Sequence, residues 1–525
     1  MTRSLLYKSA FILGLSSLLS RVLGVFRDHL LARFFGVGGE GIHNLDVYYA
    51  AFRIPDFVYA LLIMGTVAAA FVPVFTTLIE DSSGKKKEMT RDANLFTVNV
   101  LNTLLVAVCI VSGVFFVCAS WILQFLVPGF GSADLELTVS LTRLMLLSPI
   151  FFSMSSVFQS VQNAFDRFVY YSLAPILYNL GIIIGIYFFA ESHGVWGIAG
   201  GVILGALFHF GIQLPGVRGL GFRYRLYVSW RDSHLREMVR LVIPRIFGMS
   251  VMQVNLIFDT LVGSLLAAGS ITVLNYAVNL NSLPMGIVGV SFAVASFATL
   301  SSLALGSKEK FAHELSRVVT SILYLVLPAT VGLFVLRFQI VDVLLGSGAF
   351  TDEDVILTGN TLAFFLIGLI GQSLIPIFAR AFYAYKNTLI PVVISVISMI
   401  INIGLNFYFA LSLDMGVYGI ALATSVAALL NMSLLLFFLR STFLKGVKCI
   451  HYPHVGAILL SSLCMGVVVN VFASYVAAFG EISFVYQILA LSASILVGVL
   501  IFFLTILPFR LEETKIILKK LGVRF

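Results

Sequence analysis

Charged residues are scarce in this chain of 525 residues, in which Asp, Glu, Lys and Arg together make up 11%. Hydrophobic residues make up 59%, and the mean hydropathy is +1.03. A soluble domain of this size with so few charges would expose apolar surface and aggregate. A β-barrel is excluded as well, because its strands alternate over about ten residues, whereas the apolar runs here are much longer. The composition therefore predicts an all-α polytopic membrane protein.

Cysteine is also rare. The four cysteines lie in or near apolar runs, without the spacing of a metal site or a disulfide framework. We interpret Cys109, Cys118, Cys449 and Cys464 as small hydrophobic core residues. A cleavable signal is not expected, because the first apolar run is too long, is interrupted by arginines and lacks a small-residue cleavage site.

Motifs of catalysis are missing from the sequence. The eight histidines are scattered, and there is no Gly-rich nucleotide loop, HExxH motif or paired-carboxylate motif. A membrane enzyme that acts on polyprenyl phosphates is therefore the least favoured class. We expect no enzymatic activity and no required cofactor.

Apolar runs long enough to cross a hydrocarbon core of roughly 30 Å recur along the chain. Basic residues cluster in one alternating set of connecting loops and acidic residues in the other, so the positive-inside rule places the basic loops and both termini in the cytoplasm. The net charge of +8 lies in those loops and indicates topology and contact with anionic lipids, not nucleic-acid binding. We predict fourteen membrane-spanning helices, centred on residues 10–35, 46–80, 94–126, 138–163, 169–190, 195–215, 238–268, 272–305, 311–336, 355–384, 389–411, 416–439, 453–476 and 484–508.

An internal repeat organises most of the chain. Residues 48–55 (YYAAFRIP) precede a small-residue stretch, and residues 277–284 (AVNLNSLP) precede another. The segment GVWGIA at 194–199 recurs as GVYGIA at 416–421. Chance similarity between apolar helices does not explain Gly and Pro at fixed offsets. We predict two six-helix lobes related by pseudo-two-fold symmetry along the membrane normal, with a site between them. The predicted domains are 1–220, 221–440 and two additional helices in 441–525.

Two arginines, Arg21 and Arg27, lie inside the first predicted span, and Asp28 follows the second of them. A guanidinium near mid-membrane costs several kcal/mol unless it faces water or an anionic partner. The three residues therefore indicate a polar cavity on the inner side of this helix. The alternative is that Arg27 and Asp28 snorkel to an interface.

The segments SRVLGVFRD at 20–28, DVYYAAFRIP at 46–55 and AFVP at 70–73 resemble the MurJ (MviN) family. These proteins are bacterial lipid II flippases of the multidrug/oligosaccharidyl-lipid/polysaccharide exporter superfamily. The resemblance covers the whole chain and implies a V-shaped molecule with a cationic cavity for the pyrophosphate headgroup. It also implies a groove beside the last two helices for the polyprenyl tail.

The resemblance implies a function as well. Lipid II would move from the cytoplasmic to the outer leaflet of the bacterial cytoplasmic membrane by alternating access, driven by an ion gradient or the membrane potential. The expected partners are lipid II and membrane lipids, with the cell-wall synthesis machinery as a further candidate.

Substrate-binding residues follow from the family motif, which places arginines at Arg21 and Arg27 and an acid at Asp46. An arginine offers a permanent charge and a bidentate fork for phosphate oxygens. The chain departs from the family where the arginine and acid of the second helix fall on Tyr59 and Met64.

A second departure lies at the start of the eighth span, where the family's Asp-Arg pair falls on Val278 and Asn279. Unexpected arginines in apolar spans are candidate substitutes, although Arg53 has the alternative of pairing with Asp56 or Asp46. The candidate substrate-binding residues are Arg21, Arg27, Asp46, Arg53, Arg245, Arg380 and Asn279.

A candidate sodium site combines residues of three spans. Asp259 is a lone acid in the seventh, Asn402 and Asn406 share one helix face in the eleventh, and Ile420 and Thr424 repeat that spacing in the twelfth. Carboxylate, amide, hydroxyl and carbonyl oxygens suit a small hard cation rather than a transition metal. The resemblance supports these ligands, because MurJ relatives hold Na⁺ with acid, amide and threonine on these helices. The alternative is interhelical hydrogen bonding alone.

Other exporters of the superfamily are the rival functions. A Na⁺/drug antiporter would have twelve spans and acids facing its cationic substrates. A polysaccharide-unit flippase would also use arginines, but the N-terminal motif favours the peptidoglycan branch.

Overall fold

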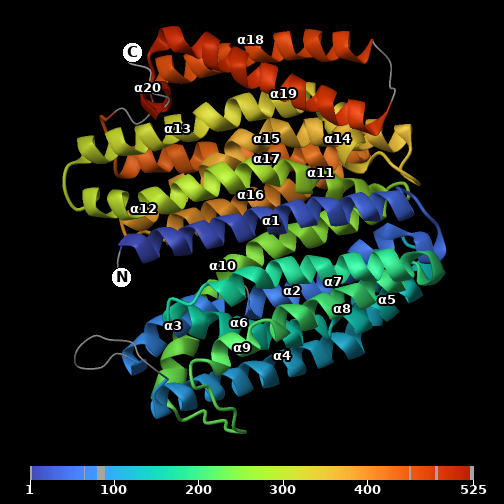
Figure 1. Cartoon of the computed structure of the whole chain (residues 1–525), viewed down its shortest axis with the longest axis vertical. Coiled ribbons are helices and arrows are strands. Elements are labelled where there is room, and N and C mark those ends of the chain that lie inside the picture. The colour runs from blue at the N-terminus through green and yellow to red at the C-terminus, as the bar shows by residue number, and fades with distance from the viewer. Residues whose placement is uncertain (1–2, 64–65, 80–88, 448–450, 479–482, 521–525) are drawn as a thin grey trace. The chain divides into compact units, whose positions relative to one another are not determined.

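The computed structural model describes residues 3–63, 66–79, 89–447, 451–478 and 483–520 (Figure 1). It describes only the backbone of residues 3–11, 66, 68–69, 244–245, 247–252, 517 and 520. Within these ranges the chain is helical and has no strand. Contacts divide it into two compact units: Met1–Thr272 with Ser347–Phe350, and Val273–Gly346 with Thr351–Phe525. The predicted lobe boundary at residue 220 comes from the sequence repeat and stays a prediction.

The first unit contains the helices up to α10 and the first residues of α11. Its helices are α1 (Arg3–Phe35), η1 (Gly41–His43), α2 (Leu45–Leu62), α3 (Thr66–Ile79), α4 (Arg91–Leu126), α5 (Ser132–Met145), α6 (Ser148–Ala164), α7 (Val169–His193), α8 (Val195–Gly211), α9 (Leu214–Arg218) and α10 (Ser233–Ser264).

The second unit contains most of α11 and all later helices. Pro284 ends α11 and is followed by a turn of π-helix, η2. The helices are α11 (Ser270–Pro284), η2 (Met285–Val290), α12 (Ser291–Leu303), α13 (Lys308–Val335), α14 (Arg337–Leu345), α15 (Asp352–Ala384), α16 (Leu389–Phe407), η3 (Tyr408–Ser412), α17 (Val417–Thr442), α18 (Tyr452–Ala477), α19 (Phe484–Ile506), η4 (Leu507–Phe509) and α20 (Glu512–Lys520).

Eleven helices in the part of the chain that the structure describes are long and apolar enough to cross a membrane. This finding confirms the predicted all-helical polytopic class, whereas the total of fourteen spans stays a prediction. The other three predicted spans fall on α1, on α2 with α3, and on α10, which carry Arg27, Asp56 and Asp259. The eleven are α4, α5 with α6, α7, α8 with α9, α11 with α12, α13, α15, α16 with η3, α17, α18, and α19 with η4.

Polar side chains mark where several long helices begin. Thr90 accepts a hydrogen bond from the Ala93 amide at the start of α4, and Asp232 accepts from the His234 amide at the start of α10. Thr351 and Asp354 form a capping box on α15. Such caps satisfy amides that lack a partner within the helix, so the sequence itself fixes these helix ends.

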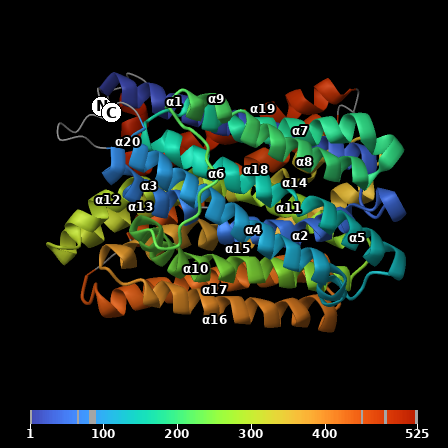
Figure 2. The same cartoon turned by 90° about the horizontal axis from the view of Figure 1, so that it is seen from below.

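The repeated GVWGIA and GVYGIA segments form equivalent turns in the two units. Gly194 joins α7 to α8 with φ of +54°, and Gly416 precedes α17 with φ of +56°. Only glycine adopts this conformation without strain. Figure 2 shows α7 beside α8 and α16 beside α17. The shared turn is a structural counterpart of the repeat that the sequence predicts.

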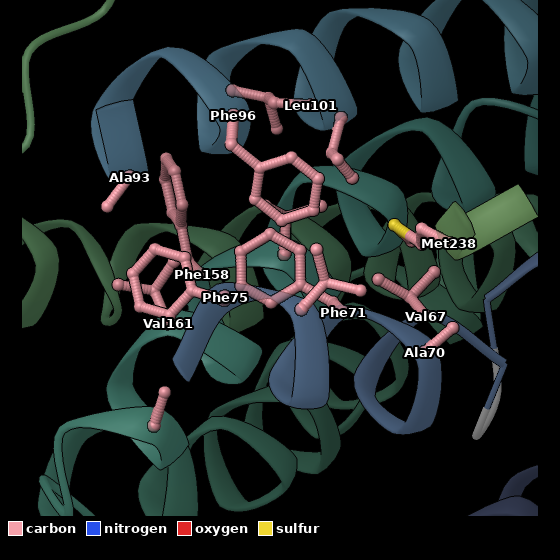
Figure 3. Close-up of a cluster of buried hydrophobic side chains, with 14 of the residues drawn as sticks. Val67, Ala70, Phe71, Phe75, Ala93, Phe96, Leu101, Phe158, Val161 and Met238 are labelled. Carbon is pink, nitrogen blue, oxygen red and sulfur yellow. The ribbon is translucent and has the colours of Figure 1, made fainter. Parts of the chain in front are cut away.

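The first unit has an aromatic core between α3, α4 and α6 (Figure 3). Phe71 stacks on Phe75 at 4.9 Å and on Phe96 at 5.2 Å between ring centroids. Met238 of α10 packs into the same cluster. This core attaches α10 to the first unit.

The prediction that all four cysteines are core residues is wrong for two of them. Cys109 and Cys464 are exposed, and Cys118 is half-buried. A thiol in a hydrophobic span can lie either on the surface that faces lipid or in the protein core. The hydropathy of the span does not distinguish these two environments. Cys449 lies outside the described residues.

Candidate functional site

Arg27 is the centre of a partly buried polar cluster between α1 and α7. Its Nη2 lies 2.8 Å from Oδ1 of Asp28, and its Nε donates to the same oxygen at 3.1 Å. The side chains are only 25% and 11% exposed. Nη1 donates to Oδ1 of Asn179 on α7 at 3.3 Å. Low exposure strengthens this ion pair, because little water screens it.

Asn179 connects the arginine to the backbone of α1. Its Nδ2 donates to the carbonyl of Ser20 at 3.1 Å and to the carbonyl of Pro175 at 3.2 Å. The amide therefore uses its oxygen for the guanidinium and its nitrogen for main-chain oxygens. This arrangement holds Arg27 in one orientation.

Arg21 is half-buried on the same helix. Among the side chains that the structure describes, it has no hydrogen-bond or ion-pair partner. A guanidinium without a protein partner keeps all five donors for an anion. Arg21 is therefore the candidate whose donors are most available.

Aromatic residues occupy the position where the family has a second-helix arginine. Tyr59 packs on Phe152 with 4.9 Å between ring centroids, and Phe152 packs on Tyr178 at 5.2 Å. Met64, the other departure in this helix, lies outside the described residues.

Arg53 links α2 to α10. Its Nε donates to Oγ1 of Thr260 at 2.7 Å, and Asp56 and Asp259 lie within electrostatic range. The guanidinium thus faces two carboxylates of the first unit. Asp259, one of the sodium candidates, therefore interacts electrostatically with Arg53.

Asp46 is 3% exposed and contacts the beginning of α11. Its carboxylate accepts hydrogen bonds from the amides of Gly269 and Thr272, both at 2.8 Å, and from the Thr272 hydroxyl at 2.6 Å. A carboxylate at this place caps the helix and complements its dipole. We therefore expect Asp46 to position α11.

The remaining substrate candidates lie further along the chain. Arg380 of α15 is half-buried and donates to the Pro376 carbonyl at 3.4 Å. Asn279 of α11 is exposed. Both belong to the second unit, whereas Arg21, Arg27, Asp46 and Arg53 belong to the first. The side chain of Arg245 lies outside the described residues.

Three of the five sodium candidates form a cluster in the second unit, in which Asn402 and Asn406 are buried and Thr424 is half-buried. Nδ2 of Asn406 donates to Oδ1 of Asn402 at 3.3 Å, and Nδ2 of Asn402 donates to Oγ1 of Thr424 at 3.4 Å. Ile420 is buried one turn before Thr424, while Asp259 belongs to the first unit. Both hydrogen bonds are long, so rotating an amide to present its oxygen to a cation sacrifices little.

No three His, Cys, Asp or Glu side chains that could hold a metal ion come together in the described ranges. The donors of the cluster of Asn402, Asn406 and Thr424 are amide and hydroxyl oxygens. Oxygen donors of this kind fit Na⁺ by their chemistry.

Comparison with known proteins identifies the family. The profile described as lipid II flippase MurJ matches residues 31–491. The chain belongs to the MurJ family. A probable lipid II flippase MurJ of Vibrio cholerae is 32% identical over 449 residues, which cover 84% of each chain. The one of Thermotoga maritima is 29% identical over 98% of each chain.

A solved MurJ structure in an inward closed conformation aligns with a TM-score of 0.76 and 25% identity, covering 97% of this chain and 99% of that one. An inward-facing multidrug resistance MATE transporter of the MOP superfamily aligns with a TM-score of 0.61 at 15% identity, which shows a shared fold alone. The family resemblance and fold class inferred from the sequence are confirmed.

Arg143 is a charged residue inside a predicted span of this MurJ chain that the sequence motifs do not single out. Arg143 of α5 donates through Nε to the Phe116 carbonyl of α4 at 3.1 Å, and its guanidinium lies 5.3 Å from the Phe116 ring centroid. It lines a groove of ≈ 480 Å³ between α4, α5 and α6. A scan for arginines within the predicted span 138–163 would have found it.

Proposed function

We propose that this MurJ chain moves lipid II from the cytoplasmic to the outer leaflet of the bacterial cytoplasmic membrane. A relative of Burkholderia cenocepacia that is named lipid II flippase MurJ is 30% identical over 83% of both chains. The observation that carries the proposal is the arginine pair of α1. Arg21 has open donors, and Arg27 is oriented by Asp28 and Asn179.

The chemistry of the substrate explains this arrangement. A lipid-linked pyrophosphate carries about two negative charges and does not cross hydrocarbon unaided. Arg21 offers a bidentate fork to the phosphate oxygens. Arg27 already holds Asp28, so a bound pyrophosphate competes with that carboxylate for the same guanidinium. The competition makes headgroup binding reversible, as release into the other leaflet requires.

Coupling to an ion is the second part of the proposal. Asp259, Asn402, Asn406, Ile420 and Thr424 are proposed to hold Na⁺ in one conformation and to release it in another. An ion biases alternating access only if its affinity differs between the conformations. The amide and hydroxyl cluster of α16 and α17 supports this role. The membrane potential is the alternative driving force.

The topology and organisation complete the proposal. Both termini and the basic loops are cytoplasmic, the lobes are 1–220 and 221–440, and the helices in 441–525 hold the polyprenyl tail. The charge distribution between loops supports this orientation. A phosphatase–fluorescent protein reporter fused after Arg231 should report a cytoplasmic loop, and an extracellular signal there would refute the topology. Cell-wall synthesis enzymes remain a candidate partner.

One experiment tests the function. Cells depleted of their own flippase are given this chain, and lipid II exposed on the outer surface is labelled with an impermeant probe. Restored growth and restored labelling are the expected result. Normal expression with restored export of a cationic drug but no surface lipid II would assign the chain to the drug-exporter class instead.

A further inference from the structure

The segment between α9 and α10 is extended and lies along the first three turns of α4 (Figure 1). Asn94 of α4 binds the backbone of Arg223 in both directions. Its Nδ2 donates to the Arg223 carbonyl at 2.9 Å, and its Oδ1 accepts from the Arg223 amide at 2.9 Å. This pair of hydrogen bonds fixes the start of the segment.

Two further asparagines of α4 fix the rest of the segment. Nδ2 of Asn102 donates to the carbonyls of Arg225 and Tyr227, both at 3.0 Å. Asn99 donates to the Ser229 carbonyl at 3.0 Å and accepts from the Ser229 amide at 2.8 Å. Three asparagine side chains of α4 thus provide hydrogen-bond partners for backbone groups of the segment, which has no neighbouring strand to pair with.

The order of these contacts gives the segment the shape of a loop along the helix axis. It starts at Asn94, reaches Asn102 with residues 225–227, and returns to Asn99 with Ser229. Eight residues of helix separate Asn94 from Asn102, a rise of roughly 12 Å. Residues 225–227 are therefore the tip, and they lie further along α4 than the rest of the loop.

The tip lies at the edge of the hydrocarbon core. Residues 93–126 of α4 carry no charge, and the asparagines of this stretch all lie between Asn94 and Asn102; the residues after Asn102, 103–126, span about 36 Å, slightly more than a core of roughly 30 Å. Asn102 directly precedes residues 103–126. Residues 225–227, which Asn102 binds, therefore meet the boundary between headgroups and acyl chains.

Most large side chains of the loop are exposed. Leu226 at the tip is 88% exposed, and Tyr224 and Trp230 are 56% and 60% exposed, although the Tyr224 hydroxyl donates to Oδ1 of Asn102 at 3.2 Å. At the start of the segment Phe222 packs on Phe158 with 5.3 Å between ring centroids, but apolar burial does not order the rest of the segment, since its large side chains are exposed. The asparagines instead hold the backbone so that an apolar tip and aromatic flanks are displayed.

The exposed charged side chains of residues 222–231 are all positive. Arg223, Arg225 and Arg231 are exposed beside the aromatic residues. The acid that follows, Asp232, is engaged by the amides of His234 and Leu235 at the start of α10. Each arginine near a membrane surface attracts anionic lipid by about 1 kcal/mol. Tyrosine and tryptophan favour the headgroup level.

We propose that residues 222–231 form a membrane anchor that binds anionic phospholipid headgroups, with Leu226 inserted at the acyl boundary. The position of the tip against α4, the exposed apolar side chains and the complementary charge select a lipid surface as the partner. The proposal does not depend on which lipid the chain transports.

Trp230 supplies the probe for a test, because the chain has three tryptophans. In the variant Trp121→Phe/Trp196→Phe, emission comes from Trp230 alone. The full chain is placed in nanodiscs of brominated phosphatidylcholine with or without phosphatidylglycerol. We expect quenching by brominated chains, at least about twofold stronger with the anionic lipid and reduced by high salt.

Two variants of this single-tryptophan protein sharpen the test. Arg223→Gln/Arg225→Gln/Arg231→Gln should remove the dependence on anionic lipid, and Asn102→Leu should weaken quenching by releasing the tip. Leu226→Asp should also weaken it, whereas Leu305→Asp is the matched control, since Leu305 is 82% exposed in another loop.

Each outcome decides the proposal. Trp230 emission that is quenched by aqueous acrylamide but by no brominated lipid would overturn it and favour a soluble protein partner. Quenching by brominated lipid that is equal in neutral and anionic discs would overturn the headgroup recognition. Loss of lipid II transport with intact, charge-dependent quenching would contradict the proposed function alone.

Discussion

The two units contain asparagines at equivalent places of the sequence repeat, and these asparagines have different partners. Asn179 of α7 binds the guanidinium of Arg27 and the Ser20 carbonyl. Asn402 of α16 binds the amide of Asn406 and the hydroxyl of Thr424. The repeat thus provides similar helices in the two units. The residues around each asparagine make the Asn179 cluster charged and the Asn402 cluster neutral.

The two clusters therefore suit ligands of opposite charge. A cluster with an arginine and a compensating acid attracts an anion and orients it. A neutral cluster of amide and hydroxyl oxygens leaves room for a cation without a competing positive charge. The two clusters therefore match the two chemistries that the proposed ion-coupled export of an anionic lipid needs.

The largest expected effect on function comes from replacing the arginines of α1. Arg21→Ala or Arg27→Ala should abolish complementation of a flippase-depleted cell, because each change removes one of the two guanidiniums that we assign to the pyrophosphate. Lysine at either position should restore growth only in part, since it keeps the charge and loses the fork. Growth rate and surface lipid II are the measurements.

Arg380→Ala is the control in the second unit, where the guanidinium contacts a backbone carbonyl at 3.4 Å. We expect a smaller defect than for the α1 variants. Full activity of Arg21→Ala at a normal protein level would contradict the role of α1.

A second prediction compares the repeated turns. Both Gly194→Ala and Gly416→Ala force alanine into a positive-φ conformation that side chains rarely adopt, which costs roughly 1–3 kcal/mol. A Cβ at Gly194 would also collide with the Ile42 carbonyl oxygen, whereas nothing lies within 4 Å of one at Gly416. Gly194→Ala should therefore lower the melting temperature of the purified protein more than Gly416→Ala does. Equal shifts would show that the contact with Ile42 relaxes freely.

A third prediction concerns the asparagines themselves. Asn179→Leu removes the hydrogen bond from Nη1 of the partly buried Arg27 and the bond to the Ser20 carbonyl, and it should destabilise the protein by about 1–3 kcal/mol. Asn402→Leu removes two long, neutral hydrogen bonds and should cost less. Thermal unfolding of both variants in the same detergent measures the difference. A greater loss for Asn402→Leu would reverse the ranking of the clusters.

Much of the fold could be predicted from the sequence, because hydropathy and the GVWGIA repeat depend on local pattern. The helix class and the turns at Gly194 and Gly416 are examples. The hydrogen bond between Arg27 and Asn179 joins residues 152 positions apart, and the cap of Asp46 on Thr272 joins residues 226 positions apart. No local spacing predicts such partners.

The polar residues at the start of α4 show a second limit. Asparagines near a helix end are compatible with a solvated face, so no sequence pattern pairs Asn102 with the loop around residue 226. Arg143 was missed because its span is apolar on average. Both become visible only when the helix packing is known.

The smallest expected effect belongs to the neutral cluster, and it separates ion binding from hydrogen bonding. If Na⁺ binds the second unit's amides with Asp259, sodium should raise the melting temperature of the purified protein relative to choline. At ten times the dissociation constant the stabilisation is about 1.4 kcal/mol, equivalent to a shift of a few degrees. Asp259→Ala and Asn406→Leu should each remove the sodium-specific shift while the protein stays folded. Asn179→Leu is the matched control and should keep the shift, because it alters only the charged cluster. Sodium that raises the melting temperature equally in the wild type and in Asp259→Ala would leave these asparagines with a packing role alone.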